Sequence, residues 1–329
     1  MSIRSPLALV ALLAACAQAP TYLEGHGYVA DREATLGWVL LAIACVVVVV
    51  IAVLVLAATF RRRAAGAELM REGGGLRWIV IGAVIVPSVI LLGTMIYSTA
   101  VLARVAQPAA KPPIVVQVIG HRWWWEVRYP GAAPSDAFAT ANEIHIPVRV
   151  PVQLELSTAD VIHSFWIPQL AGKTDLIPGQ TNVTWIEADT AGSYWGQCGE
   201  YCGLQHAGMH MSVVADSPAG FTRWEEAQRR VAATPVADLA VEGQKVFQGS
   251  ACAVCHAVRG TDAGGAVGPD LTHIGSRAML AAGVLPNTHG NLAGWIANPQ
   301  GIKPGVIMPA VPLRPEDLHA VVAYLQSLK

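Results

Sequence analysis

Residues 36–60, LGWVLLAIACVVVVVIAVLVLAATF, form a stretch of 25 residues without a single charge. A helix of this length exceeds the hydrocarbon core of a bilayer, which is roughly 30 Å thick. The run Val46–Val50 would favour a strand in water, but an isolated strand in lipid leaves its backbone groups unpaired. We therefore predict that residues 36–60 form a transmembrane helix.

A second apolar stretch, residues 78–102, also carries no charge and is long enough to cross a bilayer. Its interior contains Pro87, which lacks a backbone N–H and is expected to kink the helix. Of the 329 residues in the chain, 53% are hydrophobic and only 14% are charged, a balance that fits a chain partly buried in lipid. The two stretches together predict a transmembrane helical hairpin.

The loop between the two stretches decides their orientation. Its basic residues outnumber its acidic ones, with Arg61, Arg62, Arg63, Arg71 and Arg77 against Glu68 and Glu72. Because basic loops stay on the cytoplasmic side, both ends of the hairpin and everything that follows are expected to face outward. The net charge of the whole chain is -1, so no basic surface for nucleic acid is expected.

The N-terminus has the pattern of an export signal over residues 1–15. Arg4 gives the positive flank, and Pro6–Ala15 is an apolar run too short to span a bilayer. Residues 13–16, Leu-Ala-Ala-Cys, resemble the lipidation box of bacterial lipoproteins, with Cys16 as the lipid-bearing residue. A plain signal peptide with an incidental cysteine is the alternative.

After a Pro- and Ala-rich joint at residues 107–113, short strands replace the helical pattern. Residues 152–156 and 182–187 alternate apolar and polar side chains, as half-buried strands do. Further strands are expected at 114–119, 123–129 and 143–148, with turns at Pro130-Gly131, Pro178-Gly179 and Ala191-Gly192. This pattern predicts a β-sandwich or barrel over residues 107–216.

The strongest chemical signal lies in residues 198–209, CGEYCGLQHAGM. Two thiols, an imidazole and a thioether occur within this segment, and His163 precedes it in a strand-rich region. Soft sulfur ligands together with imidazole suit copper, which changes oxidation state by one electron. Two thiolates can also bridge two metal ions and spread the transferred electron over both.

Three other interpretations fit part of this pattern. Cys198 and Cys202 could form a disulfide in an oxidising compartment. Zinc could be held by the two cysteines with His163 and His206, but Met209 would then have no role. A mononuclear blue copper site normally needs only one cysteine.

The pattern Cys-x-Glu-x-Cys-x3-His-x2-Met, with His-Ser-Phe-Trp-Ile-Pro at 163–168, resembles the dinuclear copper (CuA) site of cytochrome c oxidase subunit II. Residues 172–179 and the preceding hairpin are also similar to that family, and the resemblance covers residues 36–215. It implies a cupredoxin-like Greek-key β-barrel. The implied copper ligands are His163, Cys198, Glu200 (through its backbone carbonyl), Cys202, His206 and Met209.

The same resemblance implies two roles beside the copper. The carboxylate of Glu200 would reach a magnesium or manganese ion shared with subunit I, since hard cations prefer oxygen ligands. Trp123, in the aromatic stretch Gly120–Trp125, would be an exposed indole that receives electrons from the donor.

Residues 252–256, Cys-Ala-Val-Cys-His, form the C-x-x-C-H pattern of covalent haem attachment. Cys252 and Cys255 can each form a thioether with a haem vinyl group, and His256 can bind the iron. A thioredoxin-type redox pair is the alternative, but it needs a βαβ pattern that is missing here and leaves the histidine unexplained. The sequence therefore predicts a covalently bound haem c.

The second axial ligand of the iron is expected downstream of this motif. Met308, in an Ile-Met-Pro segment before a terminal helix, is the favoured residue. Met279 is its competitor, and His273 or His289 would instead give a bis-histidine haem of lower potential.

Residues 238–329 resemble a class I cytochrome c. The segment Gly268–Leu271 matches the loop whose proline carbonyl orients the haem-ligating histidine. The resemblance implies an all-α domain, and apolar residues recur at helical spacing along its last helix. Gly243 would allow an earlier helix to cross close to Tyr324.

We therefore expect a multidomain membrane protein in five parts. These are a signal peptide (1–15), an N-terminal segment with the hairpin (16–106), a CuA domain (107–216), a linker (217–237) and a cytochrome c domain (238–329).

Together the two resemblances imply subunit II of a proton-translocating haem-copper cytochrome c oxidase of the caa type. Electrons would pass from cytochrome c, or from a donor such as a quinol-cytochrome c reductase, through haem c and CuA to subunit I, which reduces oxygen to water. The expected location is the bacterial plasma membrane beside subunits I and III, with both termini and both outer domains on the periplasmic side. The alternatives are the electron-input subunit of a CuA-containing nitric oxide reductase and a free-standing membrane-tethered electron carrier.

Overall fold

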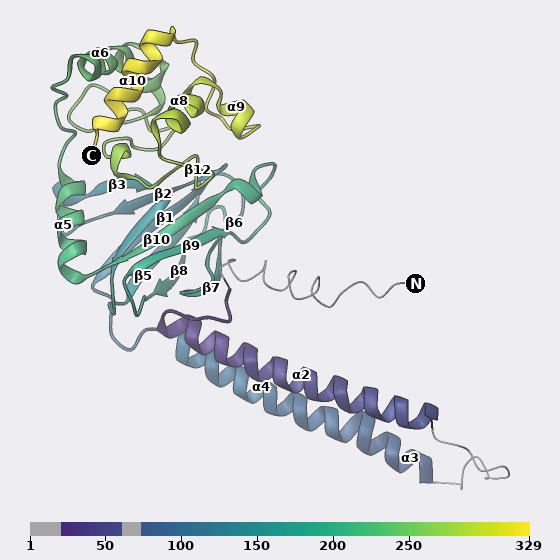
Figure 1. Cartoon of the computed structure of the whole chain (residues 1–329). Helices are drawn as coiled ribbons and strands as arrows, with labels where there is room; N and C mark the ends of the chain where they lie inside the picture. Colours follow the sequence, from purple (N-terminus) through teal and green to yellow (C-terminus); the bar gives the residue numbers. More distant parts are fainter. Residues whose placement is uncertain (1–20, 61–73) are drawn as a thin grey trace, which may run out of the picture.

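The computed structural model describes residues 21–60 and 74–329. The expected signal peptide, the lipidation site Cys16 and the loop residues Glu68 and Glu72 lie outside these described residues. Within them the chain forms a helical hairpin, a β-domain and a small helical domain, in that order (Figure 1). This order confirms the predicted fold class.

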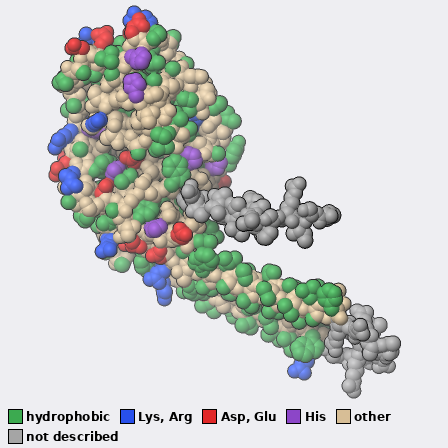
Figure 2. Space-filling view, in the orientation of Figure 1, with side chains coloured by type: hydrophobic (Ala, Val, Ile, Leu, Met, Phe, Trp, Pro, Cys, Tyr) green, Lys and Arg blue, Asp and Glu red, His purple; other side chains and the backbone are tan. Residues whose placement is uncertain are grey.

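The hairpin consists of two long apolar arms. Helix α2 spans Tyr28–Phe60, and the second arm runs through α3 (Gly74–Ile79), a π-helical turn (Val80–Ile85) and α4 (Val86–Val105). Both arms are long and apolar enough to cross a membrane, and their most apolar windows are not buried by the rest of the chain. Figure 2 shows the hairpin as a hydrophobic surface with charged side chains only near its ends, as a lipid-facing element requires.

The second arm departs from a regular helix just before Pro87. This residue has no N–H to donate to the carbonyl one turn earlier. The π-helical turn at Val80–Ile85 lies directly upstream, and its wider hydrogen-bond spacing accommodates the missing donor. The irregularity expected at this proline therefore takes the form of a widened turn.

The β-domain consists of two five-stranded sheets with the orders β3-β2-β1-β5-β8 and β4-β10-β9-β6-β7. Strand β1 runs parallel to β5, and β10 runs parallel to β4, so crossover connections as well as hairpins link the strands. The strands are β1 (Ile114–His121), β2 (Trp124–Tyr129), β3 (Phe138–Ala141), β4 (Glu143–Pro147), β5 (Val152–Thr158), β6 (His163–Ile167), β7 (Ala171–Leu176), β8 (Asn182–Ile186), β9 (Gly192–Cys198) and β10 (His210–Asp216).

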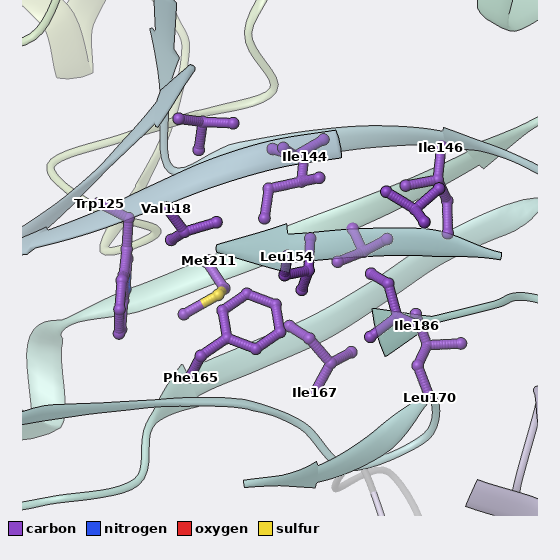
Figure 3. Packing of buried hydrophobic residues seen from close by; sticks show 14 of the residues in the cluster. Val118, Trp125, Ile144, Ile146, Leu154, Phe165, Ile167, Leu170, Ile186 and Met211 are labelled. Carbon is purple, nitrogen blue, oxygen red and sulfur yellow. The ribbon is translucent and has the colours of Figure 1, made fainter. Parts of the chain in front are cut away.

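The core of the β-domain lies between the two sheets. Alternate residues of β1, β2, β5 and β10 face inward, as Val116 and Val118 do on β1, and both are fully buried. Trp125, Phe165 and Met211 bring larger side chains into the same core (Figure 3). This packing fixes the ends of β6, β9 and β10, from which the predicted metal ligands project.

Helix α5 (Pro218–Arg229) occupies the first part of the region expected to be a linker. The Ser217 hydroxyl caps this helix by accepting a hydrogen bond from the Gly220 N–H. Phe221 is buried in the core of the β-domain, and Trp224 stacks on His145 of β4 with 4.1 Å between the ring centroids. Helix α5 therefore packs as part of the β-domain, and only residues 230–237 connect it to the next helix.

The C-terminal domain is mainly helical, with α6 (Asp238–Gly249), α7 (Ala251–Cys255), α8 (His289–Ala297), α9 (Pro299–Ile302) and α10 (Pro315–Ser327). A two-stranded pair, β11 (Met279–Leu280) and β12 (Leu285–Pro286), adds a small sheet that the sequence did not predict. Helices α6 and α10 cross at Gly243, where a methyl group would collide with the Ala320 carbonyl and Tyr324. The predicted close crossing is confirmed.

The C-terminal domain sits on the end of the β-domain that lies opposite the hairpin (Figure 1). The His210 N–H donates to the Ala282 carbonyl at 3.0 Å, and the Gln205 side-chain amide donates to the Pro304 carbonyl at 2.8 Å. Both donors belong to the region of the predicted metal ligands. The interface between the two domains therefore lies directly beside that region.

The crossing of α6 and α10 gives a stability prediction. Gly243→Ala should lower the free energy of unfolding by about 1–3 kcal/mol, because the added methyl group has no space between the helices. Thermal and urea unfolding of the full chain, followed by circular dichroism, measure this change. Gly249→Ala is the matched control on the same helix, since nothing lies within 4 Å of its added methyl group. Equal stability of the two variants would contradict the prediction.

Candidate metal centre and haem cavity

The topology brings the predicted metal ligands together from two neighbouring strands and one loop. His163 begins β6 and Cys198 ends β9, and these strands are adjacent, with Phe165 paired to Cys198. The chain then runs through residues 199–209, including a short 3-10 turn at His206–Gly208, and returns as β10. The local sequence motif thus becomes a compact site only because β6 lies next to β9.

All six predicted ligand groups converge on this site. The Sγ atoms of Cys198 and Cys202 lie 3.8 Å apart at its centre. Their further neighbours are His163 Nδ1 (3.9 Å) and the Glu200 carbonyl oxygen (3.2 Å) on the Cys198 side, and His206 Nδ1 (3.7 Å) and Met209 Sδ (3.9 Å) on the Cys202 side. Each thiol therefore has one imidazole and one weaker donor beside it, as two metal ions bridged by sulfur require.

The distances at this site distinguish the copper interpretation from the disulfide and zinc alternatives. Cys198 and Cys202 are free thiols, and their sulfur separation of 3.8 Å is far beyond a disulfide bond of about 2.05 Å. A zinc site would use both cysteines with His163 and His206 but would not use the fully buried Met209. The paired soft donors fit copper best.

The two thiols are hydrogen-bonded to each other, and their pKa values shift in opposite directions. The hydrogen bond with Cys202 lowers the pKa of Cys198 to about 3, although burial opposes this shift. The same hydrogen bond, together with burial, raises the pKa of Cys202. The lowered pKa of Cys198 favours a thiolate, the form in which cysteine binds metal ions.

Asp160 orients His163 and was missed by the sequence analysis. Its carboxylate lies 2.8 Å from His163 Nε2 and also accepts hydrogen bonds from the N–H groups of Val161 and Arg122. The carboxylate fixes the proton on Nε2, which leaves His163 Nδ1 free to face the sulfur atoms. Burial alone would lower the pKa of His163, but its hydrogen bonds with Cys198 and Asp160 raise it. The position of Asp160 three residues before His163 was the only available signal.

Glu200 has separate uses for its backbone and its side chain. Its carbonyl faces Cys198, whereas its half-exposed carboxylate forms an ion pair of 3.0 Å with Lys173. The carboxylate therefore pairs with a partly exposed lysine, whereas the carbonyl of the same residue faces the predicted metal site.

Trp123 is not exposed, and this part of the prediction was wrong. Its exposed fraction is 9%, because residues 303–306 of the C-terminal domain cover it. The indole N–H donates to the Cys202 carbonyl at 3.0 Å, and the Trp123 carbonyl accepts a hydrogen bond of 2.8 Å from Lys303. The covering segment belongs to a different domain, so the local sequence around Trp123 could not reveal the burial.

A large cavity in the C-terminal domain contains the predicted haem-binding residues. Cys252, Cys255 and His256 all line it. His256 Nδ1 lies 2.8 Å from the Pro269 carbonyl, so it carries the proton and leaves Nε2 free for a metal. Burial also lowers the pKa of His256, which favours the neutral, metal-binding form. The donor set and the cavity therefore fit a covalently bound haem.

Two of the four candidates for the second axial ligand reach this cavity. Met308 and Met279 both line it, whereas His273 and His289 do not. The ring nitrogens of His273 lie within 3.1 Å of two backbone carbonyls, and His289 contacts Gln326. The bis-histidine alternative is therefore disfavoured.

The cavity wall also includes buried basic side chains that the sequence did not single out. Arg277 is buried, donates to the Asp270 carbonyl and leaves its Nε without a partner. The β-domain contributes Trp123, Trp124 and Asn142 to the same wall. The cavity is therefore closed partly by the domain that carries the metal centre.

Comparisons with known proteins find a family match for each of the two outer domains. Residues 114–217 match the family model for the cytochrome c oxidase subunit II periplasmic domain, and residues 240–329 match the cytochrome c family model. The chain is 41% identical over 217 residues to cytochrome c oxidase subunit 2 of Alkalihalophilus pseudofirmus, covering 66% of this chain and 61% of that protein. It is 32% identical over 231 residues to the Bacillus subtilis protein of the same name, covering 67% of this chain and 64% of that protein.

A solved structure, the periplasmic domain of subunit II of cytochrome oxidase from Bradyrhizobium japonicum, is 29% identical, with a TM-score of 0.35. It covers 37% of this chain and 97% of its own. The chain thus spans about three fifths of the length of the curated relatives that it matches.

The position of Asp160 predicts a loss of metal affinity on substitution. Asp160→Asn should weaken copper binding by about 10–100-fold, because His163 loses its charged hydrogen-bond partner. A competition titration of the full chain against a copper chelator measures this affinity. Asp262→Asn, at an exposed position in the C-terminal domain, is the control and should leave the affinity unchanged. Unchanged affinity in Asp160→Asn would show that the carboxylate does not orient the ligand.

Proposed function

Since the chain belongs to the cytochrome c oxidase subunit II family over residues 114–217 and carries a cytochrome c domain over residues 240–329, we propose that it is the electron-input subunit of a terminal haem-copper oxidase. It accepts electrons from cytochrome c, or from a quinol-cytochrome c reductase, through haem c and CuA. It passes them to subunit I, where the reduction of oxygen to water is coupled to proton pumping. Bound haem and copper supply the one-electron redox couples.

One observation carries this proposal. Trp123 lines the haem cavity, and its indole N–H is hydrogen-bonded to the carbonyl of the metal ligand Cys202. A single side chain therefore lines the cavity and is hydrogen-bonded to the backbone of a predicted copper ligand. In the proposed relay Trp123 receives electrons from the haem side and not from an external donor.

The predicted copper ligands each lie within 4 Å of one of the two sulfur atoms. His163 and His206 would be the terminal ligands, Cys198 and Cys202 would be the bridging ligands, and Met209 would be a weak ligand. The Glu200 carbonyl completes the set. Because Asp160 and the strand pairing fix His163 and Cys198, little rearrangement is needed when the charge of the centre changes.

The haem is held by covalent and polar contacts from this chain. Cys252 and Cys255 would provide the thioether links, while His256 and Met308 would bind the iron. Arg277, with its free Nε in the cavity wall, is placed to pair with a haem carboxylate. The Pro269 carbonyl keeps the His256 ring oriented.

We further propose how the chain is held in the membrane and in the oxidase complex. The hairpin anchors the chain in the bacterial plasma membrane, with both outer domains on the periplasmic side, and Cys16 carries a lipid after the signal peptide is removed. The Glu200 carboxylate binds a magnesium or manganese ion shared with subunit I. Its present ion pair with Lys173 is half exposed, so it can be exchanged when the partner subunit docks.

The central test removes one bridging sulfur. Cys202→Ser should abolish the electron paramagnetic resonance spectrum of an unpaired electron shared by two coppers, because oxygen cannot replace the bridging thiolate. Haem content should stay normal, and oxygen uptake by the assembled complex should fall to background. Cys45→Ser, in helix α2, is the control and should behave as the parent. Oxygen uptake that persists in Cys202→Ser would overturn the proposed relay.

A second test separates the two methionines in the cavity. Met308→Ala should open a coordination position, so that carbon monoxide binds the reduced haem of the purified chain, and the haem midpoint potential should fall. Met279→Ala should keep a closed, low-spin haem. The reverse pattern in the absorption spectra would assign the axial position to Met279.

A further inference from the structure

The C-terminal domain contacts the β-domain at several places, including the hydrogen bonds from the His210 N–H to the Ala282 carbonyl and from the Ala278 N–H to the Glu143 carboxylate. Two further attachments are made by basic side chains. The first lies at the end of α5, where the Arg259 guanidinium donates to the carbonyls of Gln228 and Arg229. The Ala232 N–H also donates to the Arg259 carbonyl at 2.9 Å. These contacts lie next to the connecting segment 230–237, so by themselves they would leave the domain free to rotate about that point.

The second attachment is made by a buried lysine. Lys303 follows α9, and its exposed fraction is 2%. Its Nζ donates to the Trp123 carbonyl at 2.8 Å and to the Ala281 carbonyl at 2.9 Å. Trp123 belongs to the β-domain and Ala281 to the C-terminal domain, so one ammonium group joins the two domains.

The next two residues lie on the same surface. The Pro304 carbonyl accepts a hydrogen bond of 2.8 Å from Gln205, the neighbour of the metal ligand His206. Gly305 has a positive φ of 87°, and a side chain there would approach both Leu204 and the Trp123 ring. We name residues 303–305 the strap, because they are hydrogen-bonded to Trp123 and to the loop of predicted metal ligands and lie close to the Trp123 ring.

The strap is short and lies between the two candidate centres. Met308 follows it by only three residues, and the Trp123 beneath it is bonded to the Cys202 carbonyl. Burial lowers the pKa of Lys303 to about 7, which shows how unfavourable this environment is for an ammonium group. Packing alone could be satisfied by an apolar side chain, whereas two carbonyls on different domains require a donor.

We propose that Lys303 is a positioning residue that holds the haem cavity at a fixed position relative to Trp123. It thereby sets the rate of electron transfer between the haem and the copper centre. It acts through the hydrogen bonds that it donates across the domain interface. This inference rests on the proposed function for the electron-transfer step, whereas the docking of the two domains can be measured without it.

The test compares Lys303→Met with the parent, using the full chain in detergent. Amide hydrogen exchange at His210, which donates to the Ala282 carbonyl across the interface, should be faster by about tenfold or more when the strap is released. In the haem- and copper-loaded chain, flash reduction of the haem should be followed by transfer to copper that is slower by about tenfold or more. Haem content, the copper resonance spectrum and the rate of haem reduction should stay at parental values.

Two further variants make the test decisive. Lys245→Met makes the same chemical change at an exposed site of the same domain and should alter neither measurement. Gln205→Glu keeps the side-chain volume but replaces the donor to the Pro304 carbonyl with an acceptor, so it should loosen the strap even if Lys303→Met fails to fold.

Each outcome has one reading. Parental exchange at His210 in both strap variants overturns the inference, and so does slower electron transfer with parental exchange, since Lys303 would then act through its charge. If the parent shows no transfer from haem to copper, the proposed function fails. The hydrogen-exchange measurement at His210 still shows whether the strap joins the two domains.

Discussion

The position of Trp123 is the constraint on which the rest of the structure depends. Its indole N–H is bonded to the Cys202 carbonyl, its own carbonyl is bonded to Lys303, and its ring lies against Gly305. Moving this side chain would disturb the metal loop, the domain interface and the wall of the haem cavity at once. The two sites are therefore one continuous structure and not two modules joined by a flexible chain.

The β-domain supplies the rigidity that this arrangement needs. The ligands come from the ends of β6 and β9 and from the loop before β10, and all three strands pack on the buried core around Trp125, Phe165 and Met211. Ligands at the ends of strands are held in position by the sheet, whereas ligands on an unsupported loop would be less precisely positioned. Asp160 adds a second constraint by fixing the His163 ring.

The sequence predicted those features whose physical cause is local. A charge-free stretch of 25 residues leaves a helix as the only stable form in lipid, and the two metal motifs place their donors within a few residues. Strands β3, β6, β7, β9 and β10 were missed, and in β6 and β9 the polar and ligand residues interrupt the apolar alternation. The burial of Trp123 could not be read locally, since Lys303 is 180 positions away.

The position of the C-terminal domain on the β-domain determines which of the two domains an electron donor can contact. Only residues 230–237 separate α5 from α6. The C-terminal domain therefore binds the β-domain within the same chain, at a high effective concentration. Its contacts at Trp123 are buried hydrogen bonds and close packing, which need no long-range steering by surface charge. It covers Trp123, so this side chain is buried in the interface between the two domains. In the proposed relay, the electron donor therefore binds the C-terminal domain, and the β-domain passes each electron on to subunit I.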